Sequence, residues 1–431
     1  MLSDSIRRWN PWWAQGEVED KYKGVERGEL RSLKDGLKND LIKSVIGPRR
    51  AGKTTLLYQT IDHLIQDGVP PKDILLLNFD DYNIYETDFD RLMAECGKIN
   101  PNISHLFLDE VQEREGWQRW VRTIYDTDQY DQIFITGSSS YLLQEEMSRI
   151  LTGRHVTCRL LPFSFKEYLW YNGWEDFDKD FIEYNKDKIL YHLSQYLNNG
   201  GFPETLGMKD MERDGYLNNL FDDIVARDIS ARHGAEYHIT RRIAHYVVSN
   251  ITSNLSYHNI AEACGIATAT VSKYMDYMES AYLLYPLTRF SYKLKEQMRY
   301  QKKYYAIDNG FADVVSFRFS ENRGQRAENA VFLDLLRKGS MGSEIYYWKD
   351  KSGKEVDFVT KNKEEVDYVI QVCWDISRPQ TKKREFSSLT AALDKLNVSE
   401  GYILTENTEG EETIDGKTIH LIPLWKWFLD M

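Results

Sequence analysis

Residues 41–59 of the 431-residue chain read LIKSVIGPRRAGKTTLLYQ, which constrains the fold more than any other part of the sequence. It begins as an apolar strand, continues as a loop with the spacing GxxxxGK[ST] from Gly47 to Thr54, and ends in an amphipathic helical pattern. Glycines at these positions let consecutive backbone N–H groups turn toward a phosphate, and the positive end of the helix dipole lies beside them. The stretch therefore predicts a strand, a phosphate-binding loop and a helix, in that order.

The residues of this loop have distinct expected tasks. Lys53 is a mobile cation that would reach the β and γ phosphates of ATP, and the Thr54 hydroxyl would ligate Mg²⁺. We expect the nucleotide to contact the whole loop, which comprises Gly47, Pro48, Arg49, Arg50, Ala51, Gly52, Lys53, Thr54 and Thr55. ATP and Mg²⁺ are therefore the cofactors that the sequence predicts.

A second acidic element lies in residues 103–112, ISHLFLDEVQ, where an apolar strand ends in two carboxylates. A phosphate-binding loop needs such an element to hold the metal. We expect Asp109 to hold the hydration shell of Mg²⁺ and Glu110 to polarise the water that attacks the γ-phosphate. Glu110 and Lys53 are thus the main catalytic candidates.

Apolar stretches alternate with helical ones through the first third of the chain. The predicted strands are Ile42 to Ile46, Ile74 to Phe79, Ile103 to Leu108, Ile133 to Thr136 and Val156 to Leu160. This alternation predicts an α/β fold with a parallel sheet covered on both faces. The ligand should lie at the carboxyl ends of the strands.

Two further positions are candidates for sensing the γ-phosphate. The fourth strand ends in QIFITGSSS, residues 132–140, so Thr136 or Ser138 would be a polar sensor or would simply cap the strand. Arg154 lies in LTGR, residues 151–154, just before the fifth strand. From there this arginine could reach a phosphate of its own chain or of a neighbouring subunit, and the second case requires a homo-oligomer; the alternative is an ordinary surface arginine.

The middle of the chain is helical and rich in aromatic residues. Residues 254–287, NLSYHNIAEACGIATATVSKYMDYMESAYLLYPL, predict two helices joined by a turn at Gly265 and followed by strand-like residues up to Tyr305. This pattern is typical of a winged helix-turn-helix. Such a module would contact double-stranded DNA, or would dock a protein. The candidate DNA contacts are Lys273, Lys293, Lys295 and Arg299.

Charge is distributed unevenly along the chain, whose formal net charge is −12. Residues 231–303 contain ten basic and five acidic residues, so this segment carries +5 and the remainder −17. The overall sign excludes a chain that coats nucleic acid through its total field, but a local basic surface is compatible with it.

Composition adds three expectations. The chain is 42% hydrophobic and 28% charged, which excludes disordered and collagen-like classes. No signal peptide or membrane span is expected, which predicts a cytoplasmic protein with no membrane partner. The four cysteines form no CxxC motif, so we expect buried thiols.

The last third predicts a helix bearing Glu328, then a strand, a hairpin bearing Asp357, and another strand. This layout is similar to that of the restriction-endonuclease-like fold, whose chemistry needs Asp followed by Glu-x-Lys on the next strand. Here Gln371 and Cys373 stand at the Glu-x-Lys positions. Since a thiol cannot replace an ammonium beside a phosphate, we expect a scaffold rather than a nuclease.

Taken together, the motifs resemble those of one prokaryotic family. They are NPWW, GPRRAGKTT, LFLDEVQ, ITGSSS, LTGR, LPFSFKEYL, GGFPE, DIVARDI, KYYAIDNGF and EVDFV. The chain looks like an AAA-type P-loop ATPase with a C-terminal restriction-endonuclease-like domain of unknown function. The resemblance implies an ATPase site at Lys53, Thr54, Asp109 and Glu110, a phosphate-sensing role for Arg154, and a winged helix.

These observations predict three domains: residues 1–165 as the ATPase, 166–310 as the helical and winged-helix domain, and 311–431 as the nuclease-like domain. The leading functional hypothesis is an ATP-hydrolysing switch whose nucleotide state positions the later domains to engage DNA or a protein. One alternative is a DNA- or protein-binding module that holds ATP or ADP with little turnover. Another is an ATP-dependent metal nuclease.

Overall fold

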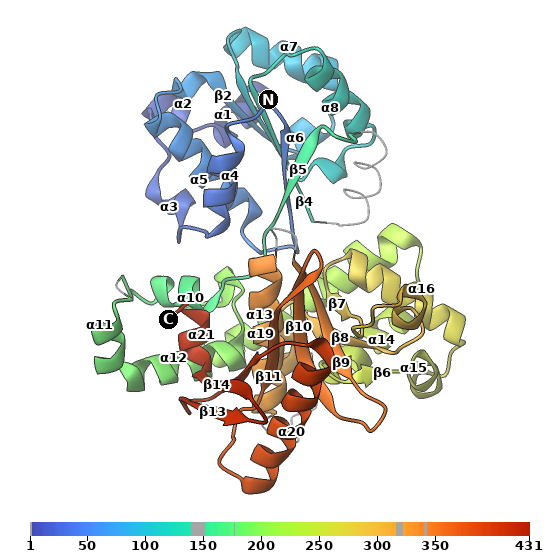
Figure 1. Ribbon diagram of the computed structural model, residues 1–431. Helices are drawn as coiled ribbons and strands as arrows, with labels where there is room; N and C mark the ends of the chain where they lie inside the picture. Colours follow the sequence, from blue (N-terminus) through green and yellow to red (C-terminus); the bar gives the residue numbers. More distant parts are fainter. Residues whose placement is uncertain (1, 139–150, 176, 316–321, 340–342) are drawn as a thin grey trace. The chain divides into compact units, whose positions relative to one another are not determined.

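The computed structural model describes residues 2–138, 151–175, 177–315, 322–339 and 343–431. Their contacts cluster into two compact units (Figure 1). Unit 1 comprises Met1–Leu160 with the short segment Ser280–Tyr282, and unit 2 comprises Leu161–Glu279 with Leu283–Met431. Unit 1 contains one sheet and unit 2 contains two, and each unit has its own hydrophobic core.

Unit 1 contains a five-stranded parallel sheet. Its strands are β1 (Ile42–Ile46), β2 (Ile74–Asn78), β3 (His105–Asp109), β4 (Gln132–Gly137) and β5 (His155–Arg159). All strand pairs are parallel, and each strand lies within two residues of its predicted position. The expected parallel α/β fold is confirmed for this unit.

The order of the strands in space differs from their order along the chain. The sheet runs β2-β3-β4-β1-β5, so β4 lies between the P-loop strand and the acidic strand, and β2 is at the edge. In the register of the sheet, Thr136 of β4 lies beside Val45 of β1. The polar end of β4 is thereby placed next to Asp109 rather than at the periphery.

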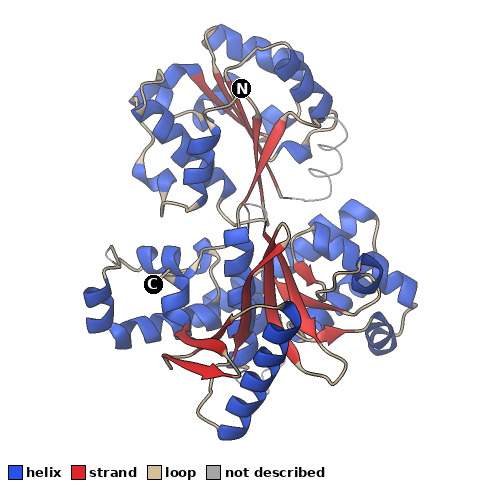
Figure 2. Cartoon of the chain, in the orientation of Figure 1, coloured by secondary structure: helices blue, strands red, loops and turns tan. Residues whose placement is uncertain are grey.

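Helices lie on both faces of this sheet (Figure 2). They are α1 (Leu2–Trp9), α2 (Trp12–Gln15), α3 (Asp20–Lys23), α4 (Glu29–Gly36), α5 (Lys53–Gln66), α6 (Tyr82–Tyr85), α7 (Phe89–Ile99) and α8 (Trp117–Asp126). Helix α5 follows the P-loop and buries Leu56, Leu57 and Ile61 in the core of the unit. Because apolar side chains hold α5 on the sheet, the loop before it is fixed at both ends.

The side chain of Asn10 continues the sheet beyond its edge strand β2. Its Nδ2 donates to Leu76 O at 2.8 Å and to Ile6 O at 2.7 Å, and its Oδ1 accepts from Leu76 N at 2.7 Å. The side chain therefore satisfies both backbone polar groups of a residue on the edge strand. The NPWW motif thus covers an edge that would otherwise be open to pairing.

We expect Asn10→Ala to destabilise unit 1 by about 2–4 kcal/mol, since it removes these hydrogen bonds and leaves buried backbone groups of Leu76 without partners. The urea concentration at the midpoint of unfolding would fall. Asn102→Ala is the matched control because Asn102 is exposed. Equal midpoints for the two variants would contradict the role of Asn10.

The first part of unit 2 is mainly helical. Its helices are α10 (Phe165–Tyr171), α11 (Lys179–Tyr184), α12 (Lys186–Asn199), α13 (Asp210–Asp223), the π-helix η5 (Ile224–Ala231), α14 (Tyr237–Ser249), α15 (Tyr257–Cys264), α16 (Thr268–Ser280) and α18 (Asn309–Val315). Gly265 ends α15 with a φ of 64°, which provides the expected turn before α16. A three-stranded antiparallel sheet accompanies these helices: β6 (Asn254–Leu255), β8 (Lys302–Ala306) and β7 (Leu284–Leu287), in that order. The predicted helices and strands are present, and the winged-helix assignment stays a prediction.

The second part of unit 2 contains a six-stranded mixed sheet. Its elements are α19 (Arg323–Lys338), β9 (Ser343–Lys349), β10 (Glu355–Asn362), β11 (Glu365–Val372), α20 (Pro379–Leu396), β12 (Glu400–Thr405), β13 (Gly410–Ile414), β14 (Lys417–Pro423) and α21 (Leu424–Phe428). The strand order is β13-β14-β12-β11-β10-β9. β9, β10 and β11 are antiparallel, whereas β11, β12 and β14 are parallel. The expected succession of elements is observed, and the nuclease-like assignment stays a prediction.

Contacts join the middle and C-terminal segments within unit 2. Asn329 Oδ1 accepts a hydrogen bond from Ala306 N at 2.9 Å, and Gln325 Nε2 donates to Ile251 O at 2.6 Å. The division of this unit at residue 310 therefore stays a prediction, because contacts alone do not separate the two segments.

The structure shows the state of the cysteines and the character of the helices. All four cysteines are free thiols; Cys96, Cys264 and Cys373 are buried, and Cys158 is partly buried. Within the described part of the chain, no helix combines the length and apolarity that a membrane crossing requires.

Candidate functional site

The P-loop connects the carboxyl end of β1 to α5 with a backbone that requires glycine at two positions. A Cβ atom on Gly47 would lie 2.1 Å from Leu160 O, which no side chain could occupy. Gly52 has a φ of 95°, and Arg50 a φ of 64°. Both values lie in the left-handed region, where glycine is favoured. The loop thus has the tight, strained course that exposes backbone N–H groups to a phosphate.

Lys53 reaches back over this loop. Its Nζ lies 3.1 Å from Pro48 O, 3.3 Å from Gly47 O and 3.3 Å from Glu110 Oε1. The side chain is almost fully buried. The ammonium group is therefore held at the mouth of the loop, beside the carboxylate that we expect to act on water.

Asp109 is fully buried at the end of β3 and accepts three side-chain hydrogen bonds. The Thr54 hydroxyl and Asn78 Nδ2 each donate to Oδ2 at 2.7 Å, and the Thr136 hydroxyl donates to Oδ1 at 2.5 Å. Burial, followed by the charge of Glu110, raises the pKa of Asp109 to about 6. The two groups expected to hold Mg²⁺, Thr54 and Asp109, are thus in direct contact.

Glu110 differs from Asp109 in its backbone conformation and in the direction of its pKa shift. Its φ is 54°, an uncommon left-handed value for a residue other than glycine, and its backbone N–H donates to Thr136 Oγ1 at 2.9 Å. Burial alone would raise the pKa of Glu110, but the charge of Lys53, a hydrogen bond from Gln112 and the charge of Arg49 together lower it. Glu110 is therefore ionised at neutral pH, as a group that accepts a proton must be.

The two candidate sensors on β4 have different surroundings. Thr136 is fully buried and bridges Asp109 to the backbone of Glu110, so it positions both carboxylates. Ser138 is also buried, and its hydroxyl accepts from Gln112 Nε2 at 3.3 Å. Gln112 in turn donates to Glu110 Oε2 at 2.5 Å. Ser138 is thus linked to the Glu110 carboxylate through the Gln112 side chain, whereas Thr136 contacts the Glu110 backbone.

Two further residues of this site, like Gln112, were not found from the sequence. Arg27 Nη1 donates to Ala51 O at 2.6 Å, so its buried guanidinium holds the P-loop backbone in place. Asn78 lies at the end of edge strand β2 and bonds Asp109. An arginine outside the motif gives no local signal. The polar residue ending the apolar run ILLLN was a usable signal for Asn78.

Arg154 is not brought to this site. It lies just before β5, and its carbonyl accepts from Ile42 N at 2.8 Å, at the amino end of β1. Its guanidinium pairs with Asp126 at 2.7 Å. The P-loop follows the opposite, carboxyl end of β1, so the structure does not support action on the nucleotide of the same chain. Action on a neighbouring subunit stays a prediction.

The donor set fits ATP and Mg²⁺. The loop provides backbone N–H groups and the Lys53 ammonium for phosphates, while Thr54 and Asp109 provide the hard oxygen ligands that Mg²⁺ prefers. Among the described residues, no three His, Cys, Asp or Glu side chains are placed to hold a metal by themselves. A nucleotide-bound Mg²⁺ is usually completed by phosphates and water, and the protein supplies one or two ligands.

The four candidate DNA contacts lie on two separate parts of unit 2. Lys273 is exposed on α16, with its ammonium 5.7 Å from the Tyr277 ring centre. Lys293, Lys295 and Arg299 are exposed on the segment after β7. Part of the excess positive charge of residues 231–303 is unavailable to a ligand, because Lys302 pairs with Glu279 and Lys303 is buried.

The buried ammonium of Lys303 lies among three carboxylates. From β8, its Nζ is 2.8 Å from Glu355, 3.2 Å from Glu328 and 3.3 Å from Asp357. Tyr305 donates a further hydrogen bond to Glu328 at 2.8 Å. Burial, followed by the charge of Asp357, raises the pKa of Glu328 to about 7. An ammonium thus fills the position that a metal ion would need between Glu328 and Asp357.

Gln371 and Cys373 do not complete a metal site. Gln371 Oε1 is buried without a hydrogen-bond partner, and the Cys373 thiol packs in the apolar core beneath α20, where burial raises its pKa to about 12. Asp357 Oδ2 accepts from Val372 N at 2.9 Å, which engages its second oxygen.

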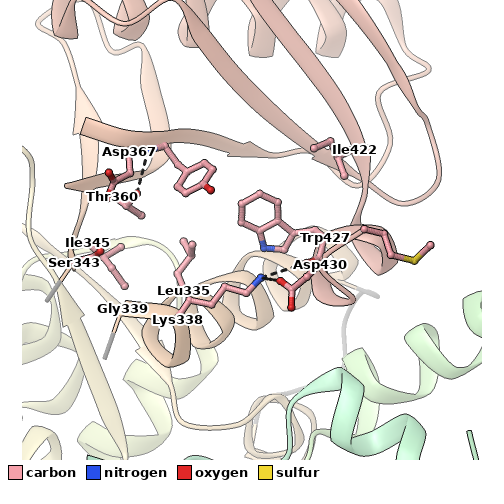
Figure 3. A pocket seen from close by; sticks show the side chains of 12 residues that line it. Leu335, Lys338, Gly339, Ser343, Ile345, Thr360, Asp367, Ile422, Trp427 and Asp430 are labelled. Carbon is pink, nitrogen blue, oxygen red and sulfur yellow. Dashed lines mark hydrogen bonds and ion pairs between the residues drawn. The ribbon is translucent and has the colours of Figure 1, made fainter. Parts of the chain in front are cut away.

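A cavity of about 440 Å³ lies elsewhere in unit 2, between α19, the mixed sheet and the C-terminal residues (Figure 3). Lys338 Nζ lies 3.1 Å from Asp334 and 2.6 Å from Asp430, and it is 5.0 Å from the Trp427 ring centre. Since two carboxylates neutralise this ammonium, it is committed to holding the C-terminal residues rather than to binding an anion.

The chain matches three known domain families. The family described as an AAA domain matches residues 39–169. Two domains of unknown function follow, DUF8612 over residues 190–322 and DUF4143 over residues 323–427. With its parallel sheet and P-loop, the protein therefore contains an AAA-type P-loop ATPase domain.

Relatives extend over nearly the whole chain. An uncharacterized protein of Methanocaldococcus jannaschii is 33% identical over 408 residues, covering 90% of this chain and 88% of that protein. An uncharacterized protein of Haemophilus influenzae is 30% identical over 400 residues, covering 90% and 95%. The chain belongs to the family that these archaeal and bacterial proteins represent.

Solved structures give more distant matches. The Walker-type ATPase of Pyrococcus abyssi matches with a TM-score of 0.45 and 14% identity, over 69% of this chain and 97% of that one. The Aeropyrum pernix ORC1 protein in complex with DNA matches with a TM-score of 0.30 and 11% identity, over 68% and 91%.

Proposed function

We propose that the protein is a Mg²⁺-dependent ATPase that works as a switch, in which the nucleotide state of the P-loop domain changes how unit 2 engages a partner. The observation that carries this proposal is the arrangement of Glu110, ionised and beside Lys53, next to the Asp109–Thr54 contact. Such an arrangement separates a metal-holding carboxylate from a water-activating one.

The roles of the residues follow from this separation. The P-loop backbone and Lys53 would orient the phosphates, and Glu110 would accept the proton of the attacking water. Bound Mg²⁺ would neutralise charge on the phosphates. Gln112, which touches both Glu110 and Ser138, would hold the Glu110 carboxylate in place.

Nucleotide binding is tested with Lys53→Ala. We expect this variant to lose most of its affinity for a fluorescent ATP analogue in the presence of Mg²⁺, because a phosphate contact to a cation is removed from a buried site. Titration by fluorescence anisotropy measures the change. Lys72→Ala is the control, since Lys72 is outside the site and outside the strands. Unchanged affinity in Lys53→Ala would refute the assignment of the loop.

For the C-terminal part of unit 2 we propose an interaction role rather than nuclease chemistry. Supporting this, the Lys303 ammonium already forms ion pairs with the Glu328, Glu355 and Asp357 carboxylates. Incubation of plasmid DNA with Mn²⁺ and Mg²⁺ should leave it uncut. Cleavage that is lost in Asp357→Ala would overturn this view.

A further inference from the structure

A groove of about 520 Å³ lies in unit 2, where the segment after β7 crosses the end of β9 and the last turns of α20. The segment is fixed to the outer edge of β9: Phe290 N donates to Tyr347 O at 2.7 Å, and Tyr347 N donates to Thr288 O at 3.1 Å. Farther along, the Tyr347 hydroxyl donates to Gln301 O at 2.6 Å. Both ends of the segment are thus anchored, and the groove between them has a defined wall. Its volume is typical of sites that bind small organic groups.

The lining of this groove is basic, in contrast to the chain as a whole. Its basic residues are Arg289, Lys293, Lys349, Lys351 and Lys395, and its acidic residues are Glu296 and Asp350. The groove thus carries a net charge of +3 in a chain of −12. A local reversal of sign of this kind attracts a polyanion to one place on the surface.

Some charged groups of the groove are bonded within the protein, and others are not. Lys351 and Lys395 are exposed, and no described acidic side chain forms an ion pair with either. The Asp350 carboxylate accepts from the Ser352 hydroxyl at 2.7 Å and from Lys354 N at 2.9 Å. The two lysines are therefore available to an anion, while the nearby carboxylate is held by its own turn.

Aromatic rings lie between these cations. Tyr292 is 72% exposed, and its ring is supported at one edge by Phe290, with ring centres 5.1 Å apart. The Arg289 guanidinium lies over the Tyr300 ring, with its Cζ 3.8 Å from the ring centre. An exposed tyrosine gains little by packing in the folded chain. Its face is open to stack with another planar group.

We propose that this groove binds single-stranded nucleic acid, with a base stacked on Tyr292 and backbone phosphates beside Lys351 and Lys395. Exposed aromatic faces alternating with cations are the features that recognise single strands, whose bases are free to stack. A duplex offers no free base face to such a ring. The inference rests on the proposed function in one respect: the single strand would be the partner that the ATP-dependent switch engages.

The test is fluorescence anisotropy with a labelled 20-nucleotide oligothymidylate and the full-length protein, at several salt concentrations. Tyr292→Ala should raise the Kd about tenfold, in line with the loss of one stacked base. The double variant Lys351→Glu, Lys395→Glu should make the negative slope of log K against log salt shallower by about 1.4, as expected for two lost phosphate contacts. An unlabelled duplex of the same length should compete poorly.

Two control variants isolate the groove. Tyr184→Ala removes another exposed tyrosine, on α11, and Lys188→Glu reverses another exposed lysine, on α12. Both should bind like the wild type. The inference is overturned if the wild type does not bind the oligonucleotide in low salt, if the groove variants bind like the wild type, or if the duplex competes as well as the single strand. ATP hydrolysis without oligonucleotide, measured on the same preparations, tests the proposed function separately, because unit 1 carries that site.

Discussion

Lys303→Met should lower the stability of unit 2 by about 3–5 kcal/mol at pH 7.5, the largest effect on folding that we expect from any single substitution here. Methionine preserves much of the apolar stem but leaves Glu328 and Asp357 without their cation, whereas Glu355 keeps its ion pair with Lys349 at 2.7 Å. A carboxylate without a counter-charge in a buried site is costly because it has lost its hydration. The midpoint of urea unfolding, followed by tryptophan fluorescence, measures the change.

The pH dependence of this variant has a defined sign. The pKa of Glu328 is already raised to about 7 in the folded protein, and removing Lys303 would raise it further. A carboxyl group with a raised folded-state pKa destabilises the fold above that pKa. The cost is relieved as the pH falls toward the ordinary pKa of glutamate. The difference between Lys303→Met and the wild type should therefore shrink between pH 7.5 and pH 5.5.

Lys302→Met is the matched control, since Lys302 is the neighbour on β8 and forms one partly exposed ion pair with Glu279 at 3.6 Å. Exposed pairs of this kind contribute less than about 1 kcal/mol. Equal losses in the two lysine variants would contradict the cation role of Lys303. So would a loss in Lys303→Met that grows as the pH falls.

Glu110→Gln should lower the rate constant of ATP hydrolysis about 10²- to 10⁴-fold, the range expected when a general base is removed. The amide keeps the size of the side chain but cannot take a proton from water. Because Lys53, Thr54 and the loop backbone are unchanged, affinity for ATP should be retained. Phosphate release and nucleotide binding, measured on the same preparation, distinguish the two effects.

Glu115→Gln is the control for this substitution, because Glu115 is an exposed glutamate in the same loop region. It should hydrolyse ATP at the wild-type rate. The role of Glu110 would be contradicted if Glu110→Gln and the wild type released phosphate equally fast. It would also be contradicted if the variant lost ATP binding, since the carboxylate would then act on binding rather than on turnover.

Unit 1 was predictable from the sequence because its signals are local. The strands are continuous apolar runs, and the loop from Gly47 to Thr54 follows one of them directly. The spatial order of the strands was less accessible, since the place of β4 between β1 and β3 depends on pairing between distant segments. Thr136 and Ser138 could be predicted as sensor candidates from the sequence. Only the strand pairing shows that Thr136 contacts Asp109 and Ser138 contacts Gln112.

Long-range contacts account for what the sequence did not reveal. Arg27 reaches the P-loop from a position that no motif marks. Lys303 is the first residue of the KYYAIDNGF motif, but that motif does not indicate its contact with Asp357. Arg154 was selected for its place before a strand, yet in a parallel sheet a residue before β5 lies at the amino edge, away from the phosphates. Direction along the strand therefore decides against action within the same chain.

The measurement that tests the central claim most directly is steady-state phosphate release by the purified full-length protein at saturating ATP, with Mg²⁺ and with excess EDTA. The Glu110→Gln variant measured in parallel provides the background. We predict Mg²⁺-dependent turnover by the wild type at least about 100-fold above that background. Wild-type release no faster than that of Glu110→Gln, or release that persists in EDTA, would contradict the assignment of this protein as a Mg²⁺-dependent ATPase.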